Sequence, residues 1–480
     1  MSDRRPAAPA PSDSESCSSV SRRTVLRGSV AAAGLPIIGA GLGTMSSAAS
    51  WQRIRGANDR LSIGVIGTGG MGTGHVRDLV SRSQAENVRV TRVCDVYQRR
   101  LDHAAGLAAQ QDDVLASAGD ASTLGTMEYR EVLDDPSVDA VLIATPDHWH
   151  VKIAIEAMDA GKDVYVEKPL SHTIEQALAC RDAVKRTGRV LQVGPQGTSD
   201  GRMWAAREAI ERGAIGKVTW SQGAYCRNSR GGQFNWRIDP DATPKAARGS
   251  AGHVWWDRWL GWEHELAERI PWNADHFFRF RKYFAYNGGL ATDLLYHRLA
   301  PLLMAISGHS GEYPKRVVAS GGRYLEKDER DIPDTFMMVA DYPSEHSVML
   351  VSVMTNDVGL PLMIRGQHAT MDIEPTFRLR EQGVWAPEFR ANNADALSRA
   401  NVGGGDVSSI NPGQAEFPMQ GVARRDQKDN WFDAIRNGDR LACDVDLGCS
   451  TMVAIKMAVE AYRQNKVMQW DAEAERMVAS

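Results

Sequence analysis

A glycine-rich turn between an apolar run and an amphipathic segment constrains the fold of this chain more than any other feature. Residues 61–66 have the composition of a buried strand, and a helical pattern covers residues 71–82. Their junction has the spacing GxGxxG, whose glycines permit a tight turn, let the backbone approach a pyrophosphate and bring helix against strand. The amides at the helix N-terminus would face the phosphates. The residues expected to contact the nucleotide here are Gly67, Gly69, Gly70, Met71 and Gly72.

The pattern around and beyond this turn is that of a parallel sheet covered on both faces by helices. Strands are expected at 61–66, 88–94, 140–144, 164–166 and 190–193, and helices at 71–82, 97–110, 148–160 and 174–187. With 480 residues, of which 43% are hydrophobic, the chain is long enough to bury cores in two domains. We therefore expect a Rossmann NAD(P)-binding domain over residues 60–195.

Residues 196–480 have a different pattern. A long irregular stretch precedes strands that follow one another without an intervening helix, which indicates a largely antiparallel sheet. The expected fold class is therefore α/β, with a C-terminal substrate-binding α+β domain built on a largely antiparallel open sheet. Its expected elements are helices at 202–212, 428–437 and 450–464, strands at 218–225, 336–342 and 348–355, and a polar loop or insertion at 392–417.

The first fifty residues differ sharply from the rest of the chain. Arg22 and Arg23 precede a Gly/Ala-rich apolar stretch at 28–45, and small residues follow at 48–50. This order is typical of a twin-arginine export signal with cleavage near residue 50, which predicts a periplasmic protein. A disordered tail with an incidental Arg pair is the alternative. A membrane anchor is disfavoured, because glycines dilute an apolar run that barely reaches a spanning length.

Charge and cysteine usage exclude several classes of function. A net charge of -4, from 56 basic and 60 acidic residues, leaves no electrostatic footprint for nucleic acid. The 6 cysteines show no CxxC pair, so neither a zinc site nor a disulfide framework is indicated, although Cys443 and Cys449 are close enough in sequence to pair. Asp147, His148 and His150 are too close in sequence to converge on one ion. We therefore expect no metal site.

Asp95 completes the nucleotide-binding pattern. It ends the second expected strand, about twenty residues beyond the glycine turn, where its carboxylate would accept hydrogen bonds from the adenosine ribose. That position favours NAD. NADP remains an alternative cofactor because Arg99 and Arg100 follow, and a guanidinium there would neutralise a ribose phosphate. The other interpretation is that both arginines lie on a solvated helix face.

Two further turns follow buried strands at the edge of the sheet where ligands bind. Thr145 and Pro146 follow one of them and are expected to line the cofactor, with His150 nearby in a polar or a packing role. Glu167-Lys168-Pro169 closes the strand at 164–166. In this context we expect Lys168 to be catalytic rather than a solvated surface charge.

These residues together resemble the Gfo/Idh/MocA family, which includes glucose-fructose oxidoreductase and inositol dehydrogenase. The marks are the glycine turn, Thr145-Pro146, the run at 160–169, and Gly288-Gly289 followed by Asp293 and His297. In the family's pattern this last spacing carries substrate binding and catalysis. Asp293 and His297 also lie in a segment that reads as helix, where side chains four apart share a face. An exposed helical Asp/His pair is the alternative.

The resemblance implies an oxidoreductase that moves a hydride between NAD(P) and a secondary alcohol or ketone of a sugar, polyol or glycoside. Lys168 or His297 would take the hydroxyl proton, and Asp293 would anchor a second hydroxyl. Lys168 would otherwise stay charged and stabilise the developing alkoxide. Glu167 would contact the nicotinamide ribose and hold Lys168, while Pro169 fixes the backbone direction. The family also implies a homo-oligomer.

Other functions remain open at this point. A redox-assisted glycoside hydrolase or lyase with tightly bound NAD is the first alternative, and a nucleotide-binding sensor without catalysis is the second. Asp147 departs from the Asn that many relatives carry after the Thr-Pro turn. Sugar contacts are conceivable from tryptophans that otherwise pack in the core, and from a few polar residues: Trp236, Trp255, Trp256, Trp259, Trp262, Trp272, Arg227, Arg237, Arg279 and Tyr283.

Overall fold

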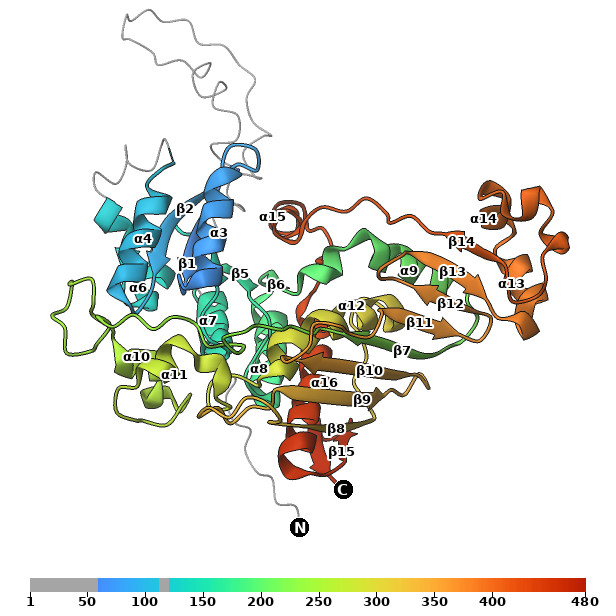
Figure 1. The fold of residues 1–480 in the computed structure, drawn as a ribbon. Coiled ribbons are helices and arrows are strands. Elements are labelled where there is room, and N and C mark those ends of the chain that lie inside the picture. Colours follow the sequence, from blue (N-terminus) through green and yellow to red (C-terminus); the bar gives the residue numbers. More distant parts are fainter. Residues whose placement is uncertain (1–58, 112–120) are drawn as a thin grey trace, which may run out of the picture. The chain divides into compact units, whose positions relative to one another are not determined.

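The computed structural model describes residues 59–111 and 121–480 (Figure 1). The expected twin-arginine leader, residues 1–50, lies outside the described residues. Within the described ranges, no helix combines the length and the apolar character needed to cross a lipid bilayer.

The first part of the described chain forms a six-stranded parallel sheet with the order β3-β2-β1-β4-β5-β6. Every residue of β1 (Leu61–Ile66) and β4 (Ala140–Ile143) is buried, which explains their continuous apolar sequences. The strand order reverses between these two strands, so their carboxyl ends open into the crevice where such sheets bind ligands. This is the predicted Rossmann arrangement.

The remaining strands of this sheet are β2 (Val88–Cys94), β3 (Gly125–Thr126), β5 (Asp163–Val166) and β6 (Leu191–Val193). Its helices are α3 (Gly70–Ser81), α4 (Gln98–Ala108), α6 (Tyr129–Leu133), α7 (Asp147–Asp159) and α8 (Ile174–Thr187). In α8, Thr173 and Gln176 form a capping box and Gly188 ends the helix in a left-handed conformation, so both termini are encoded locally.

Beyond β6 the chain builds a ten-stranded sheet with the order β14-β13-β12-β11-β7-β10-β9-β8-β15-β16 (Figure 1). Only β7 and β10 pair in parallel, and the other neighbours are antiparallel. Burial alternates along β9 and β10, so one face of each strand is covered. The sequence-based prediction of a mostly antiparallel sheet is therefore confirmed.

The bounds of this second sheet are β7 (Val218–Ala224), β8 (Arg316–Gly322), β9 (Thr335–Asp341), β10 (Ser347–Val353), β11 (Met363–Gly366), β12 (Ala369–Asp372), β13 (Arg378–Glu381), β14 (Glu416–Pro418), β15 (Met468–Asp471) and β16 (Arg476–Ala479). Its helices are α9 (Gly201–Glu211), α10 (Trp256–Leu260), α11 (Ala274–Phe278), α12 (Tyr296–Ser307), α13 (Ala386–Asn392), α14 (Ala394–Arg399), α15 (Gln427–Asn437) and α16 (Val445–Gln464).

Two late helices connect the cores of the two sheets. α16 contacts α8 on one side and β8 on the other, and most of its residues are buried. α15 packs against the parallel sheet, where the Trp431 ring lies 5.7 Å from the ring of Tyr165. Residues near the C-terminus therefore complete the core beneath the nucleotide-binding sheet.

The polar loop or insertion expected at residues 392–417 contains short regular elements. These residues contain α14 and two short 3-10 turns, and they lead into β14, which forms the edge of the large sheet. Leu397 and Phe417 are buried there, and Phe417 packs on Phe389 with ring centroids 6.1 Å apart. These apolar residues are too widely spaced to produce a helical or a strand period, so the sequence pattern missed them.

Candidate active site

One cavity of about 710 Å³ extends from the glycine turn to the π-helical turn Ala291–Leu295. That volume is in the range of a ligand pocket. Of the residues expected to form the site, ten line this cavity: Gly67, Gly69, Gly70, Met71, Asp95, Thr145, Pro146, Lys168, Asp293 and His297. Gly72, Glu167 and Pro169 are not among its lining residues.

The glycine turn is shaped by close contact on one side and open space on the other. A Cβ atom on Gly72 would lie 1.8 Å from the carbonyl oxygen of Gly67, which itself has a φ of +87°. Gly72 therefore acts by letting α3 approach β1. A Cβ atom on Gly70 would meet no described atom within 4 Å. The open space at the first turn of α3 leaves room for a pyrophosphate, which the backbone amides of a helix N-terminus favour.

Asp95 is buried at the end of β2 and is fixed by the glycine turn. One carboxylate oxygen accepts hydrogen bonds from Thr68 N at 2.7 Å and Thr68 Oγ1 at 3.2 Å, and the other accepts one from Tyr97 N at 2.9 Å. Burial raises the pKa of Asp95 above its ordinary value, although these hydrogen bonds and Arg100 favour the ionised form. Three of the roughly four lone-pair sites of the carboxylate are thus used, and Oδ1 retains one for a ribose hydroxyl.

Arg99 and Arg100 have different environments. Arg99 is exposed and pairs with Asp239 and Asp241. Arg100 lines the cavity, where its guanidinium lies 5.1 Å and 5.3 Å from the ring centroids of Phe277 and Phe278. Only Arg100 is therefore placed to meet a ligand beside Asp95.

His150 connects the Thr145 turn with the turn at Pro169. Its Nδ1 lies 2.7 Å from the Pro169 carbonyl oxygen, and its Nε2 lies 2.8 Å from the Thr145 carbonyl oxygen. A neutral imidazole donates to only one of them at a time. Burial lowers the pKa of His150, which favours that neutral form. The residue thus holds the two turns together from behind the cavity.

Lys168, Asp293 and Arg281 form a buried ionic cluster at the far end of the cavity. Lys168 Nζ donates to the carbonyl oxygen of Asp293 at 2.7 Å and to its Oδ1 at 3.0 Å. Arg281 Nε donates to the same Oδ1 at 2.7 Å. Burial opposes ionisation of this carboxyl, but the two cations outweigh it and hold the pKa of Asp293 far below its ordinary value.

Asp293 lies in a π-helical turn rather than in the regular helix that the sequence predicted, and α12 begins only at Tyr296. Gly289 precedes it with a φ of +66°, and Asp293 N donates to the Gly289 carbonyl oxygen at 2.9 Å. π turns are rare in proteins and often occur at functional sites. The double glycine therefore sets the start of the turn that directs Asp293 toward Lys168.

His297 follows this turn and also lines the cavity. Its ring centroid lies 5.8 Å from that of Tyr225. Burial, and then the charge of Lys168, lower the pKa of His297 to about 3. The imidazole is therefore neutral at physiological pH and able to accept a proton.

The carboxyl of Asp147 lies behind the same cluster. It is 3% exposed, and its Oδ2 accepts a hydrogen bond from Asn287 Nδ2 at 2.7 Å. Burial raises the pKa of Asp147 to about 7. Asn287 Oδ1 in turn accepts from Gly289 N at 2.7 Å. The residue that departs from the family pattern therefore supports the loop before Asp293.

Glu167 directs its carboxylate away from the cavity. Its Oε1 lies 2.8 Å from His75 Nε2, and its Oε2 accepts from the backbone amide of Lys168 at 3.2 Å. Burial disfavours its charge, but the contact with His75 dominates and lowers the pKa of Glu167. The expected support of Lys168 is thus made through the backbone.

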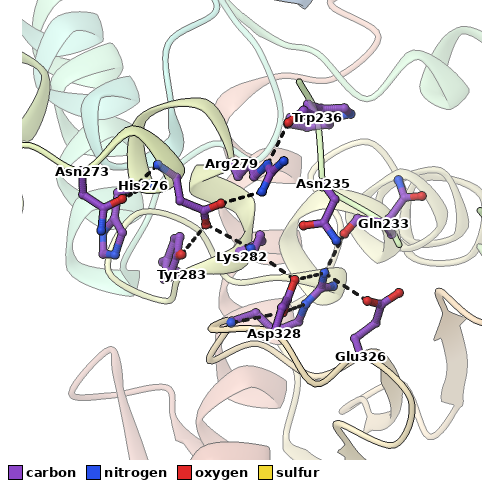
Figure 2. Close-up of polar contacts among 12 residues, drawn as sticks. Gln233, Asn235, Trp236, Asn273, His276, Arg279, Lys282, Tyr283, Glu326 and Asp328 are labelled. Carbon is purple, nitrogen blue, oxygen red and sulfur yellow. Dashed lines mark hydrogen bonds and ion pairs between the residues drawn. The ribbon is translucent and has the colours of Figure 1, made fainter. Parts of the chain in front are cut away.

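A polar network anchors the wall beyond Arg281 (Figure 2). Lys282, which is 3% exposed, bridges Asp275 Oδ2 at 3.0 Å and Asp328 Oδ2 at 3.2 Å. Arg330 is fully buried and pairs with Asp328 through its Nε at 2.6 Å. The network joins three segments that are distant in sequence.

The same network fixes the backbone of residues 233–236 at two points (Figure 2). Arg330 Nη2 donates to the Gln233 carbonyl oxygen at 3.0 Å, and Arg279 Nε donates to the Trp236 carbonyl oxygen at 2.7 Å. Trp236 and the following Arg237 line the cavity. Arg279 therefore holds the wall and is absent from the lining.

Sequence reasoning missed Arg281, although it considered several neighbours. Arg227 and Arg237, two of the possible sugar contacts, line the cavity. Tyr283, another of them, instead donates a hydrogen bond to Asp275. Arg281 is twelve positions before Asp293, a spacing that no local periodicity relates, so no signal in the sequence identified it. Most of the tryptophans pack, with Trp256 stacked on Trp259 at 4.9 Å, while Trp236 and Trp259 reach the cavity.

Comparisons with known proteins match parts of this chain. Residues 61–195 match the GFO_IDH_MocA model, described as an oxidoreductase family with an NAD-binding Rossmann fold. A levoglucosan dehydrogenase of Pseudarthrobacter phenanthrenivorans is 38% identical over 117 residues, which cover 24% of this chain and 28% of that protein. A glycosyl hydrolase family 109 protein of Shewanella sp. is 28% identical over 172 residues, or 36% of each chain. The matches span about a third of these curated relatives.

Among solved structures, the WlbA dehydrogenase from Bordetella pertussis in complex with NADH and UDP-GlcNAcA has a TM-score of 0.56 to this chain. Sequence identity is 14%, and the match covers 86% of this chain and 99% of that one, so the likeness concerns the fold. Together with the glycine turn and Asp95, the match over residues 61–195 shows that this part of the chain has an NAD-binding Rossmann fold and is similar to the Gfo/Idh/MocA oxidoreductase family.

Proposed function

We propose that this protein is an NAD-dependent oxidoreductase acting on a secondary alcohol or ketone of a sugar, polyol or glycoside. One observation carries the proposal: a single cavity joins the glycine turn and Asp95 to Lys168, Asp293 and His297. The first group fits a dinucleotide and the second supplies proton-transfer and charge-stabilising groups. The similarity to a levoglucosan dehydrogenase supports a carbohydrate substrate.

The residues present fit a nicotinamide dinucleotide. The open cradle at Gly70 would hold the pyrophosphate, Asp95 the adenosine ribose, and Thr145 and Pro146 the wall toward the nicotinamide. When bound, the nicotinamide supplies hydride acceptance and donation. The carboxylate of Asp95 favours NAD, since it would repel a ribose phosphate.

We assign proton transfer to His297. His297 would accept the proton of the substrate hydroxyl, while the bound nicotinamide would supply hydride acceptance at the carbinol carbon, so that the alcohol becomes a ketone. Lys168 is paired with Asp293 through two hydrogen bonds, which suits it to stabilise the developing alkoxide rather than to act as the base. Asp293 would orient Lys168 and bind a neighbouring hydroxyl.

A second candidate function follows from the similarity to a glycosyl hydrolase family 109 protein. Here, transient oxidation beside the scissile bond acidifies a C–H group, and the hydride returns after the bond breaks. The same His297 and Lys168 would serve both routes. The two routes differ in whether reduced cofactor accumulates.

The decisive experiment measures cofactor reduction and bond cleavage together. Purified protein is assayed for bound nucleotide and then challenged with sugars, polyols and glycosides, while absorbance of NADH and released products are followed. Net NADH formation is the expected result. Bond cleavage without net NADH formation would support the hydrolase and contradict the dehydrogenase. If the protein bound NAD but turned over none of the substrate classes, both proposed activities would be contradicted.

We also propose that residues 1–50 direct twin-arginine export to the periplasm and that the mature protein forms a homo-oligomer. Retention of the precursor in the cytoplasm when Arg22 and Arg23 are replaced by Lys would support the export route. Export unaffected by this change would contradict it. Sedimentation of the mature protein measures the oligomeric state.

A further inference from the structure

The end of the cavity that holds Asp293 and His297 carries more positive than negative side chains. Three guanidinium groups, those of Arg227, Arg237 and Arg281, line it with Lys168. We refer to the three arginines as the arginine cluster. Asp293 is the one carboxylate that the described chain contributes to this end of the lining, and its Oδ1 is already shared by Lys168 and Arg281.

The other charged groups of the cavity leave this imbalance unchanged. Arg100 lies near the glycine turn, close to Gly69, and Arg258 pairs with Glu128. Asp95 is at the opposite end, held by Thr68. A dinucleotide in its cradle would therefore meet Asp95 and Arg100, whereas the arginine cluster remains for a different ligand.

Arg281 is fixed in position but retains free donors. One of its five N–H groups, on Nε, is used by Asp293. The guanidinium lies 5.1 Å from the ring centroid of Trp236 and 4.6 Å from that of Phe280, which restrains its plane. Neither terminal nitrogen has an acceptor within the part of the chain that the structure describes. These nitrogens form the fork that binds an anion in a bidentate manner.

Arg227 and Arg237 add donors on either side. Arg227 Nη2 donates to Tyr225 Oη at 3.3 Å, and the Tyr225 ring lies beside His297. Arg237 is exposed and has neither an ion pair nor a side-chain hydrogen bond to another described residue. It follows Trp236, whose carbonyl oxygen is held by Arg279 (Figure 2). Neither guanidinium has a carboxylate partner among the described residues.

We infer that the substrate is an anionic sugar, whose carboxylate or phosphate is bound by the arginine cluster while its carbinol lies at His297 and Asp293. This inference rests on the proposed function and narrows its substrate class. Guanidinium groups match carboxylate and phosphate geometry alike, so either anion satisfies the same contacts. Arg227 and Arg281 are half-buried and Arg237 is exposed, so an anion would pair with guanidinium donors that a neutral sugar would leave to solvent.

The test measures sugar binding to the NADH-loaded protein through quenching of tryptophan fluorescence, which Trp236 makes sensitive to this end of the cavity. The probes are D-glucuronate, D-glucose 6-phosphate, D-glucose and myo-inositol. We expect at least one anionic probe to bind about ten- to a hundredfold more tightly than glucose, since hydrogen bonds to charged groups carry that much. The probe that binds more tightly, glucuronate or glucose 6-phosphate, shows whether the arginine cluster binds a carboxylate or a phosphate.

Arg237→Gln should remove most of that preference, measured as the ratio of the affinity for the anionic probe to the affinity for glucose. Arg212→Gln is the matched control, because Arg212 is exposed at the end of α9 and outside the cavity lining. The Arg212→Gln variant should retain the preference for the anionic probe, because it removes one positive charge outside the cavity.

The outcomes separate this inference from the proposed function. Equal affinity for glucose and both anionic probes, or a preference that persists in Arg237→Gln, would overturn the inference. NADH formed from neutral sugars alone would also overturn it while supporting the proposed function. Tight anion binding that needs Arg237 without any turnover would support the cluster and contradict the dehydrogenase.

Discussion

The two ends of the cavity are built from different materials. At the cofactor end, the glycine turn and Asp95 lie between residues 67 and 95, and Arg100, Thr145 and Pro146 complete the lining. At the substrate end, charged side chains converge from Lys168 after β5, from the segment 227–237, from residue 281 and from the π turn. The comparison teaches that the nucleotide cradle depends mainly on local backbone geometry, whereas the other end depends on side chains that only the tertiary fold assembles.

The largest expected effect tests the backbone end. Gly72→Ala should abolish nucleotide binding, because the added Cβ would lie 1.8 Å from the Gly67 carbonyl oxygen and would force α3 away from β1. Titration with NADH, with circular dichroism to monitor the fold, measures the loss. Gly74→Ala is the control, since its Cβ would meet no described atom within 4 Å. Ordinary affinity in Gly72→Ala would contradict the close approach.

The next effect tests the side-chain end. Lys168→Met should lower kcat by about 10²–10³, because it removes the donor that stabilises the developing oxyanion and leaves Asp293 with Arg281 alone. NADH affinity should change little. Lys466→Met, an exposed lysine after α16, serves as the matched control in the same turnover assay. Unchanged turnover in Lys168→Met would remove Lys168 from the chemistry.

His297→Asn should lower kcat about as much as Lys168→Met does, because it removes the proton acceptor without adding a charge. Since the pKa of His297 is lowered to about 3, the wild-type rate should show no His297 titration between pH 5 and pH 8. The pH profile of kcat tests this expectation. A rate that rises through a pKa near 6.5 and loses that rise in His297→Asn would contradict the neutral assignment.

A smaller effect concerns stability behind the substrate end. Because the pKa of Asp147 is raised to about 7, the folded state binds its proton more tightly than the unfolded state does. The stability from this proton is full below the unfolded pKa of about 4 and is lost as pH rises through 7. Asp147→Asn keeps an acceptor for Asn287 and should therefore gain stability relative to wild type between pH 5 and pH 8. Urea unfolding measures the difference, and parallel pH curves would refute it.

The smallest expected effect distinguishes two adjacent arginines at the cofactor end. Arg100→Ala should lower NADP affinity relative to NAD by about tenfold, because a charge-assisted hydrogen bond to a ribose phosphate is worth roughly that much. Arg99→Ala should leave the ratio within about twofold, since Arg99 is exposed and paired with Asp239 and Asp241. Isothermal titration with both nucleotides measures the ratio. Equal effects of the two changes would show that neither arginine discriminates.

Prediction from the sequence succeeded where the physical signal was local. The six predicted elements from 61 to 110 and 174 to 193 depend on short apolar runs, a glycine turn and helix caps, and the structure has each of them within two residues. For residues 392–417 the sequence predicted only a polar loop or insertion and missed their short elements, because widely spaced apolar residues such as Leu397 and Phe417 pack against distant partners. Arg281 was missed for the same reason: its relation to Asp293 depends on the fold of the intervening loop.

The sequence by itself determined the Rossmann sheet and the nucleotide cradle, because steric and hydrogen-bonding requirements of that unit act over short stretches of chain. The position of Lys168 after a buried strand marked that residue, and the resemblance to the Gfo/Idh/MocA family, whose model matches residues 61–195, marked Asp293 and His297. Only the tertiary structure decided that Asp293 lies in a π turn, that Glu167 faces His75, and that three arginines surround the substrate end. These features are decided by burial and by charge pairs between distant segments, and no local pattern contains that information.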